Sequence, residues 1–105
     1  MTRIVKKYNE NADAIFDRVR SACNKLGHQI TKEDTITRSL QASTGLSALS
    51  WGETLKIIVT QQRDGSTIVV DFKPRVWFNI TAENRAERNA RNLVEELEKA
   101  SKEIN

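Results

Sequence analysis

The sequence predicts an α+β domain, a two-layer sandwich in which two helices cover one face of an antiparallel sheet of about five strands. Apolar residues recur at three- and four-residue steps near residues 12–26 and 81–102, which is typical of helices. Before and between these segments, apolar and polar residues alternate, as in strands with one buried face. With 105 residues the chain can form one hydrophobic core, so residues 1–105 are expected to be a single domain.

A change of hydrophobic period separates the first two elements. Residues 2–8 mix β-forming side chains with lysines, which predicts a strand at an edge of the sheet. The next segment carries its apolar residues on one helical face, namely Ala12, Ile15, Phe16, Val19, Ala22, Cys23 and Leu26. Asn9 or Asn11 is expected to cap the start of this helix, and Gly27 to end it.

Two short β-rich segments follow this helix. They cover residues 28–32 and 35–43, and the residues between them, Glu33 and Asp34, are typical of a tight turn. The two segments are therefore expected to be strands joined by that turn, ahead of a loop of small residues at 44–50.

The clearest strand is predicted at residues 51–62, where apolar side chains occupy every second position. Residues 63–65 are a hairpin signal, and residues 66–73 resume the alternation. Pro74 cannot donate a backbone hydrogen bond, which indicates a bulge or an edge at that point. Because the alternation persists to residue 80, the strand is expected to continue beyond the proline.

The last element is predicted to be a helix that begins near Thr81 and runs to about Lys102. Its apolar positions form a narrow stripe that starts with alanines: Ala86, Ala90, Leu93, Leu97, Ala100 and Ile104. Opposite charges four positions apart, such as Glu95 and Lys99, support the helix. The narrow stripe favours close packing onto a sheet, so the predicted order is β-α-β-β-β-β-α with both helices on one face.

This order resembles one repeat of the TATA-box-binding-protein fold, and it is also similar to a shortened helix-grip domain, a fold that binds lipids and other hydrophobic ligands. The sequence separately resembles small uncharacterised bacterial domains in which a helix ending in Leu-Gly leads into a Trp-Gly-Glu segment, a Thr-Val-rich strand and a terminal helix. The matching residues are Leu26 and Gly27; Trp51, Gly52 and Glu53; Thr67 to Val70; and Asn92 to Leu97. The resemblance supports the fold and implies a bacterial domain without an established activity.

Composition argues against several classes of protein. Hydrophobic residues make up 38% of the chain and charged residues 30%, and the hydrophobic ones fall in periodic segments, which excludes global disorder. No apolar stretch approaches the roughly 20 residues of a membrane-spanning helix, and residues 1–10 lack the apolar centre of a leader peptide. The single cysteine cannot form an internal disulfide. We therefore expect a cytoplasmic protein.

Chemically reactive residues are few. His28 begins a strand, where a position at the edge of the core or on the surface is expected, and Cys23 lies on the buried helix face, where an inert thiol is expected. No CxxC, HExxH or acid-rich loop indicates a metal site, and no glycine-rich loop indicates a phosphate-bearing cofactor. We predict no catalytic residue, no metal and no cofactor, and hence a non-enzymatic protein.

A polar sheet face is the first candidate for binding. If the helices cover one face, the alternation leaves on the other Thr37, Ser39, Gln41, Ser43, Thr54, Lys56, Ile58, Thr60, Thr67, Val69 and Lys73. This face is expected to be open, and its β-branched side chains can also pair with a second copy of the chain.

An aromatic end of the domain is the second candidate, formed by Leu46, Leu49, Trp51, Trp77 and Phe78. These residues fall at predicted strand ends and in a neighbouring loop. They either plug the open end of the core or rim a site for a small apolar ligand or a protein partner. The leading hypothesis is therefore a binding or protein-interaction domain that acts through the open sheet face or this aromatic end.

Nucleic-acid binding is the alternative hypothesis. The net charge is +3, and basic residues gather around the start of the last helix: Lys73, Arg75, Arg85, Arg88 and Arg91. Such side chains can contact phosphates. However, the predicted open face lacks the aromatic platform on which single-strand-binding proteins stack bases.

Overall fold

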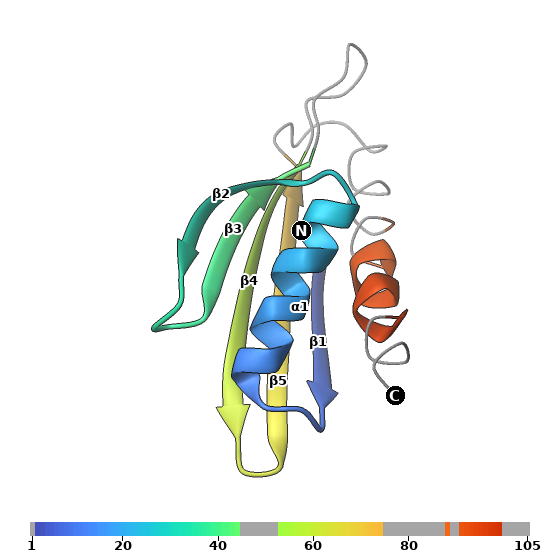
Figure 1. Cartoon of the computed structure of the whole chain (residues 1–105). Coiled ribbons are helices and arrows are strands. Elements are labelled where there is room, and N and C mark those ends of the chain that lie inside the picture. The colour runs from blue at the N-terminus through green and yellow to red at the C-terminus, as the bar shows by residue number, and fades with distance from the viewer. Residues whose placement is uncertain (1, 45–52, 75–87, 89–90, 100–105) are drawn as a thin grey trace.

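A computed structural model describes residues 2–44, 53–74, 88 and 91–99 of the chain (Figure 1). Its elements are β1 (Thr2–Tyr8), α1 (Ala12–Lys25), β2 (Gln29–Asp34), β3 (Ser39–Ser43), β4 (Glu53–Gln62) and β5 (Gly65–Pro74). A C-terminal helix follows, described at residues 88 and 91–99. The predicted α+β class and the order β-α-β-β-β-β-α are therefore confirmed.

The five strands form one antiparallel sheet in the order β1-β5-β4-β3-β2. The β4–β5 hairpin is its longest ladder and runs from Glu53 opposite Pro74 to Gln62 opposite Gly65. β1 pairs with β5 and forms one edge, which confirms the predicted edge position of the first strand. β2 and β3 form a shorter hairpin on the other side of β4.

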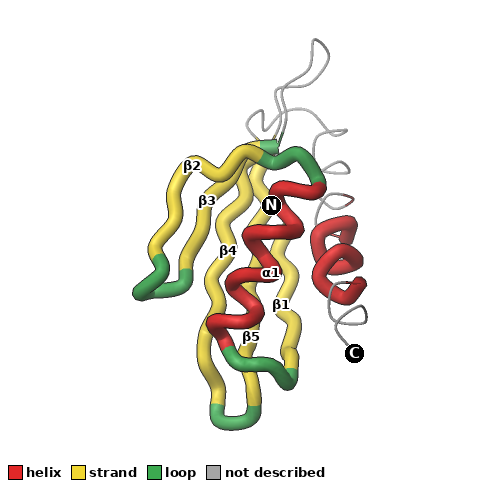
Figure 2. The backbone as a smooth tube through the Cα atoms, viewed as in Figure 1, coloured by secondary structure: helices red, strands yellow, loops and turns green. Residues whose placement is uncertain are grey.

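Both helices lie on the same face of the sheet, with α1 in front of the central strands and the C-terminal helix near β1 (Figure 2). The side chains buried between helices and sheet are at most 3% exposed: Ala12, Ile15, Phe16, Val19, Ala22, Cys23, Leu40, Ala42, Leu55, Ile57, Val59, Ile68, Val70, Phe72, Leu93 and Leu97. Apolar burial of this kind contributes roughly 25 cal/mol per Å² removed from water. The helical stripe of α1 and the alternation in β4 and β5 therefore converge on one core.

Local chemistry determines the ends of α1. Asn11 is the N-cap, because its side-chain oxygen accepts a 2.8 Å hydrogen bond from the backbone N–H of Ala14. At the other end Gly27 adopts a φ of 78°, a left-handed conformation that lets the chain leave the helix. Of the two predicted caps the structure uses Asn11, and the predicted stop at Gly27 is confirmed.

The turn between β2 and β3 lies later than the sequence predicts. Glu33 and Asp34 are the last residues of β2, and the turn occupies residues 35–38. The carboxylate of Asp34 accepts hydrogen bonds from the backbone N–H groups of Thr37 and Ile36, at 3.2 and 2.9 Å, which lowers the pKa of Asp34. An aspartate at the end of a strand that accepts hydrogen bonds from backbone N–H groups two and three residues later favours a turn directly after it. Thr37, predicted on the open face, belongs to this turn.

The tip of the β4–β5 hairpin is fastened to the start of α1. The side-chain amide of Gln61 accepts a hydrogen bond from the backbone N–H of Ala12 and donates one to the carbonyl of Gly65, both at 2.8 Å. Gly65 packs so closely on β1 that a Cβ there would lie 2.0 Å from the carbonyl oxygen of Tyr8. The predicted hairpin at residues 63–65 therefore requires glycine at its last position.

Four predicted segments fall wholly or partly outside the described residues. They are the loop from residue 45, the first two residues of the strand predicted at 51–62, the continuation of the strand beyond Pro74, and parts of the last helix. Among the residues that the structure does describe, no helix has both the length and the apolar character needed to cross a membrane.

Candidate functional site

The aromatic end predicted from the sequence lies outside the described residues, because Leu46, Leu49, Trp51, Trp77 and Phe78 are all in segments that the structure does not describe. Its role in contacting a ligand or a partner stays a prediction. The surfaces that can be built up from described residues are those of the sheet and of the two helices.

The sheet face opposite the helices carries a continuous set of side chains, which we call the open face. The register places on it most of the residues that alternation predicts: Ser39, Gln41, Ser43, Thr54, Lys56, Ile58, Thr60, Thr67 and Val69. β1 adds Arg3, Val5 and Lys7, because it pairs with β5. Lys32 and Asp34 of β2 and Asp71 of β5 share the same side. Pairing between strands therefore enlarges the predicted face by both edge strands, β1 and β2.

A short apolar row crosses the middle of the open face. Val5 stands opposite Val69, and Val69 stands opposite Ile58, so three aliphatic side chains follow one another across β1, β5 and β4. Residues directly opposite each other on neighbouring strands are close enough for their side chains to touch. Val5 is nevertheless 57% exposed and Ile58 39% exposed. The row is thus an apolar surface that faces solvent.

A row of charged and polar side chains runs beside the apolar row. Arg3, Asp71, Lys56 and Gln41 stand opposite one another on successive strands. The guanidinium of Arg3 donates hydrogen bonds of 2.7 and 3.2 Å to the two carboxylate oxygens of Asp71, and these bonds raise the pKa of Arg3. The carboxylate of Asp71 is therefore paired with Arg3 of β1.

A hollow of about 480 Å³ lies at the end of this charged row, over β2, β3 and β4. Its lining is Lys32, Glu33, Asp34, Ser39, Leu40, Gln41 and Lys56. The register of β2 against β3 shifts between Ile30 and Lys32, and such a bulge bends the strand that contains it. Two lysines flank the hollow, Lys32 on β2 and Lys56 on β4, and β3 lies between these two strands.

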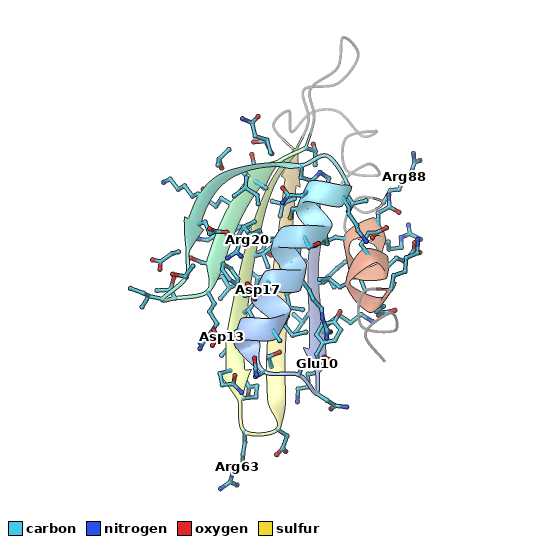
Figure 3. All side chains as sticks on the ribbon, in the orientation of Figure 1. Glu10, Asp13, Asp17, Arg20, Arg63 and Arg88 are labelled. Atoms are coloured by element: carbon cyan, nitrogen blue, oxygen red, sulfur yellow. The ribbon has the colours of Figure 1, made fainter. Side chains whose placement is uncertain are left out.

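Two of the basic residues predicted to contact nucleic acid lie on the helix side of the molecule rather than on the open face. Arg88 and Arg91 are exposed on the C-terminal helix, and Figure 3 shows Arg88 pointing away from the sheet. Lys73 belongs to β5, while Arg75 and Arg85 lie outside the described residues. The two described arginines therefore belong to the helix side of the molecule, and nucleic-acid binding stays a prediction.

The residues with reactive side chains lie on the helix side or at the edge of the core. Cys23 is 0% exposed, and burial raises the pKa of its thiol to about 11, so the thiol is protonated at neutral pH. His28 is 9% exposed, which agrees with the predicted position at the edge of the core. Within the described part of the chain, no three His, Cys, Asp or Glu side chains are grouped so that they could hold a metal ion.

A polar cluster at the end of β1 was not predicted. The hydroxyl of Tyr8 is buried and has no hydrogen-bond partner among the described residues. Burial first, and then the charges of Glu98 and Glu10, raise the pKa of Tyr8 to about 12. Nη1 of Arg18 lies 3.4 Å from Oε2 of Glu10. The cluster joins β1, α1 and the C-terminal helix, and no periodicity marks it because Glu98 is distant in sequence from Tyr8, Glu10 and Arg18.

No protein-family model and no curated protein matches this chain. Its structure is similar to the crystal structure of Ara h 8.0201, with a TM-score of 0.66, 94% of each chain covered and 10% sequence identity. That structure has a Bet v 1-like fold, and at this identity the likeness concerns the fold alone. The resemblance to the TATA-box-binding-protein fold is not confirmed.

Proposed function

We propose that this chain is a binding domain without catalytic activity, and that a protein partner docks on its open face. The observation behind this proposal is the apolar row of Val5, Val69 and Ile58, in which Val5 and Ile58 stay exposed and Val69 is half-buried, although the other face of the sheet has a closed core. Exposed apolar side chains that adjoin one another, framed by polar residues, are a feature of interaction surfaces.

The apolar row alone is too small to hold a partner. Burying a whole Val or Ile side chain contributes about 1.5–3 kcal/mol, and each of these three is already partly covered by its neighbours. The row therefore contributes on the order of 3 kcal/mol, whereas a micromolar complex requires about 8 kcal/mol. The polar and charged residues beside the row must supply the remainder, so the whole open face is expected to take part.

Binding is favoured over catalysis by the placement of the reactive groups. An acid–base or nucleophilic enzyme needs a base held next to a nucleophile in a site that substrate can enter. The cysteine and the histidine of this chain are both buried, and the described residues of the open face include neither type. Contact at the aromatic end, with a small apolar ligand or a protein, remains a separate prediction.

Site-directed photocrosslinking tests the proposal in the cells that produce the protein. A photoreactive amino acid replaces Thr60, an exposed residue of the open face, and in a matched chain it replaces Asn24, an exposed residue of α1. We expect one discrete covalent adduct with a partner protein from the position of Thr60 and none from the position of Asn24. Adding Ile58→Lys, which places a charge in the apolar row, is expected to abolish the adduct.

Two results would contradict the proposal. One is an adduct that forms at least as well from the position of Asn24, which would move the contact to the helix side. The other is an adduct at Thr60 that survives Ile58→Lys, since the apolar row would then have no part in binding. Unchanged circular dichroism and an unchanged urea midpoint for each variant exclude unfolding as the cause.

A further inference from the structure

We propose that the partner of the open face is an acidic polypeptide segment, and that its carboxylates dock at Lys32 and Lys56 while an apolar side chain beside them rests on the row of Val5, Val69 and Ile58. This inference rests on the proposed function and gives the partner its chemistry. It is based on charge complementarity, on the position of the hollow, and on the contacts already made by the acidic residues of the same face.

The described side chains of the open face carry an excess of positive charge. The cations are Arg3, Lys7, Lys32 and Lys56, and the anions are Asp34 and Asp71. Both anions are engaged within the chain: Asp71 accepts two hydrogen bonds from Arg3, and Asp34 accepts two from the backbone of the β2–β3 turn. The three lysines form no ion pair with a described residue. Their charge is therefore available to a partner.

The spacing of two of these lysines suits an extended acidic segment. Lys32 and Lys56 both stand opposite Gln41, one on each side of β3, so their backbones are about 10 Å apart at the usual strand spacing. Alternate side chains of an extended segment are about 7 Å apart, and the flexible stems of two lysines can close that difference. The amide of Gln41 and the hydroxyl of Ser39 line the hollow between them.

The acidic residues around the hollow define its limits. Glu33 borders it, but its carboxylate accepts a hydrogen bond from Arg20 on the helix side. Asp34 stays ionised because its pKa is lowered, so it repels a carboxylate at the outer end of the hollow. The region that attracts a carboxylate therefore extends from Lys32 to Lys56. The apolar contact at Ile58 lies two residues further along β4.

Two other occupants fit the open face less well. A second copy of the chain would set the same excess of positive charge against itself, which disfavours a symmetric pair. A nucleic acid is anionic, but the described open-face residues include no aromatic side chain on which a base could stack, because Tyr8 and Phe72 lie on the helix side.

Fluorescence anisotropy of a labelled peptide tests this inference on the whole purified chain. The probe is a short acetylated peptide of glutamates with leucine at its centre, and its control has glutamine at every glutamate position. We expect saturable binding of the acidic peptide, weakened by added salt because the lysines are exposed. Lys32→Gln and Lys56→Gln are each expected to weaken binding about three-fold, and the two together about ten-fold.

Lys25→Gln is the matched control, since Lys25 is an exposed lysine at the end of α1, on the helix side. It is expected to leave the affinity unchanged, whereas Ile58→Ala is expected to weaken binding through the apolar row. The inference fails if Lys25→Gln weakens binding as much as Lys32→Gln, or if the glutamine peptide binds equally well. Tighter binding of a random-sequence DNA duplex through the same lysines would overturn it in favour of nucleic acid.

Light scattering of the free chain adds a further readout. A monomer at the concentrations of the titration is expected, while a dimer that Ile58→Lys dissociates would assign the open face to a second copy and overturn the inference. The proposed function is judged separately. If photocrosslinking at Thr60 succeeds and the acidic peptide does not bind, the open face is still the contact and only the chemistry assigned to the partner is wrong.

Discussion

The two faces of the sheet are built from the same alternating strands, yet they differ in every physical property that matters for binding. Toward the helices, Leu55, Ile57 and Val59 of β4 are at most 1% exposed. Toward solvent, the intervening residues of the same strand include Lys56 and Ile58, both exposed. The difference shows that a side chain's role here depends less on its type than on which face the pleat assigns to it.

The comparison also separates stability from recognition. The helix side holds the packed core, whose contribution to folding is large and insensitive to salt. The open face holds the Arg3–Asp71 ion pair, lysines and exposed aliphatic side chains, which contribute little to folding. The lysines and the aliphatic side chains remain available for a partner. Substitutions on the helix side are therefore expected to change the free energy of unfolding, and substitutions on the open face to change the binding of a partner.

Neighbouring isoleucines of β4 give the largest contrast between the faces. Ile57 is 0% exposed and Ile58 is 39% exposed. Ile57→Ala is expected to lower the free energy of unfolding by about 3 kcal/mol, because it leaves a cavity in the core. Ile58→Ala is expected to cost less than about 1 kcal/mol, because the removed atoms face solvent. Urea unfolding of both variants measures the difference.

Equal losses of stability for the two alanine variants would contradict the assignment of faces. The slope of the unfolding free energy against urea concentration should stay unchanged in both, since a changed slope would indicate an altered denatured state rather than a lost contact.

Tyr8→Phe tests a buried hydroxyl on the helix side. Because that hydroxyl has no hydrogen-bond partner among the described residues, its removal is expected to raise the free energy of unfolding by up to about 1 kcal/mol at neutral pH. Burial raises the pKa of Tyr8 from 10.0 to about 12 in the folded chain. The unfolded chain therefore loses the proton first, and wild-type stability falls as the pH rises from 10 toward 12.

The pH dependence distinguishes the tyrosine from other groups that titrate in the same range. The difference in unfolding free energy between Tyr8→Phe and the wild type should widen between pH 10 and 12, measured by urea titration at each pH. A difference that stays constant across this range would mean that Tyr8 ionises equally in the folded and unfolded chains.

The ion pair of Arg3 and Asp71 on the open face is expected to have the smallest effect. The side chain of Arg3 is 63% exposed, so water and salt screen its attraction to the carboxylate. A double-mutant cycle of Arg3→Ala and Asp71→Asn measures the coupling energy of the pair from the free energies of unfolding. This coupling energy should be smaller than the change in unfolding free energy caused by Tyr8→Phe, and it should vanish at high salt. A coupling that persists at high salt would show that this pair is shielded from solvent and helps to stabilise the sheet.

Much of the fold could be predicted from the chain because its signals are local. The bounds of β1 agree with the prediction residue for residue, and the hairpin at residues 63–65 is present. The turn after β2 was misplaced because Asp34 acts through its side chain on residues that follow it. Of the site, alternation predicted most of the open face but not the shares of the two edge strands, β1 and β2, which include Lys32.

The sequence by itself determined the order of the elements and the faces of the central strands, because helical period, alternation and caps depend on neighbouring residues. Only the tertiary structure decided that β1 pairs with β5, which sets Val5 beside Val69 and Ile58. It also decided that Lys32 and Lys56 stand on either side of one hollow. Pairing between distant segments depends on which strands compete for each edge, and no local pattern records that choice.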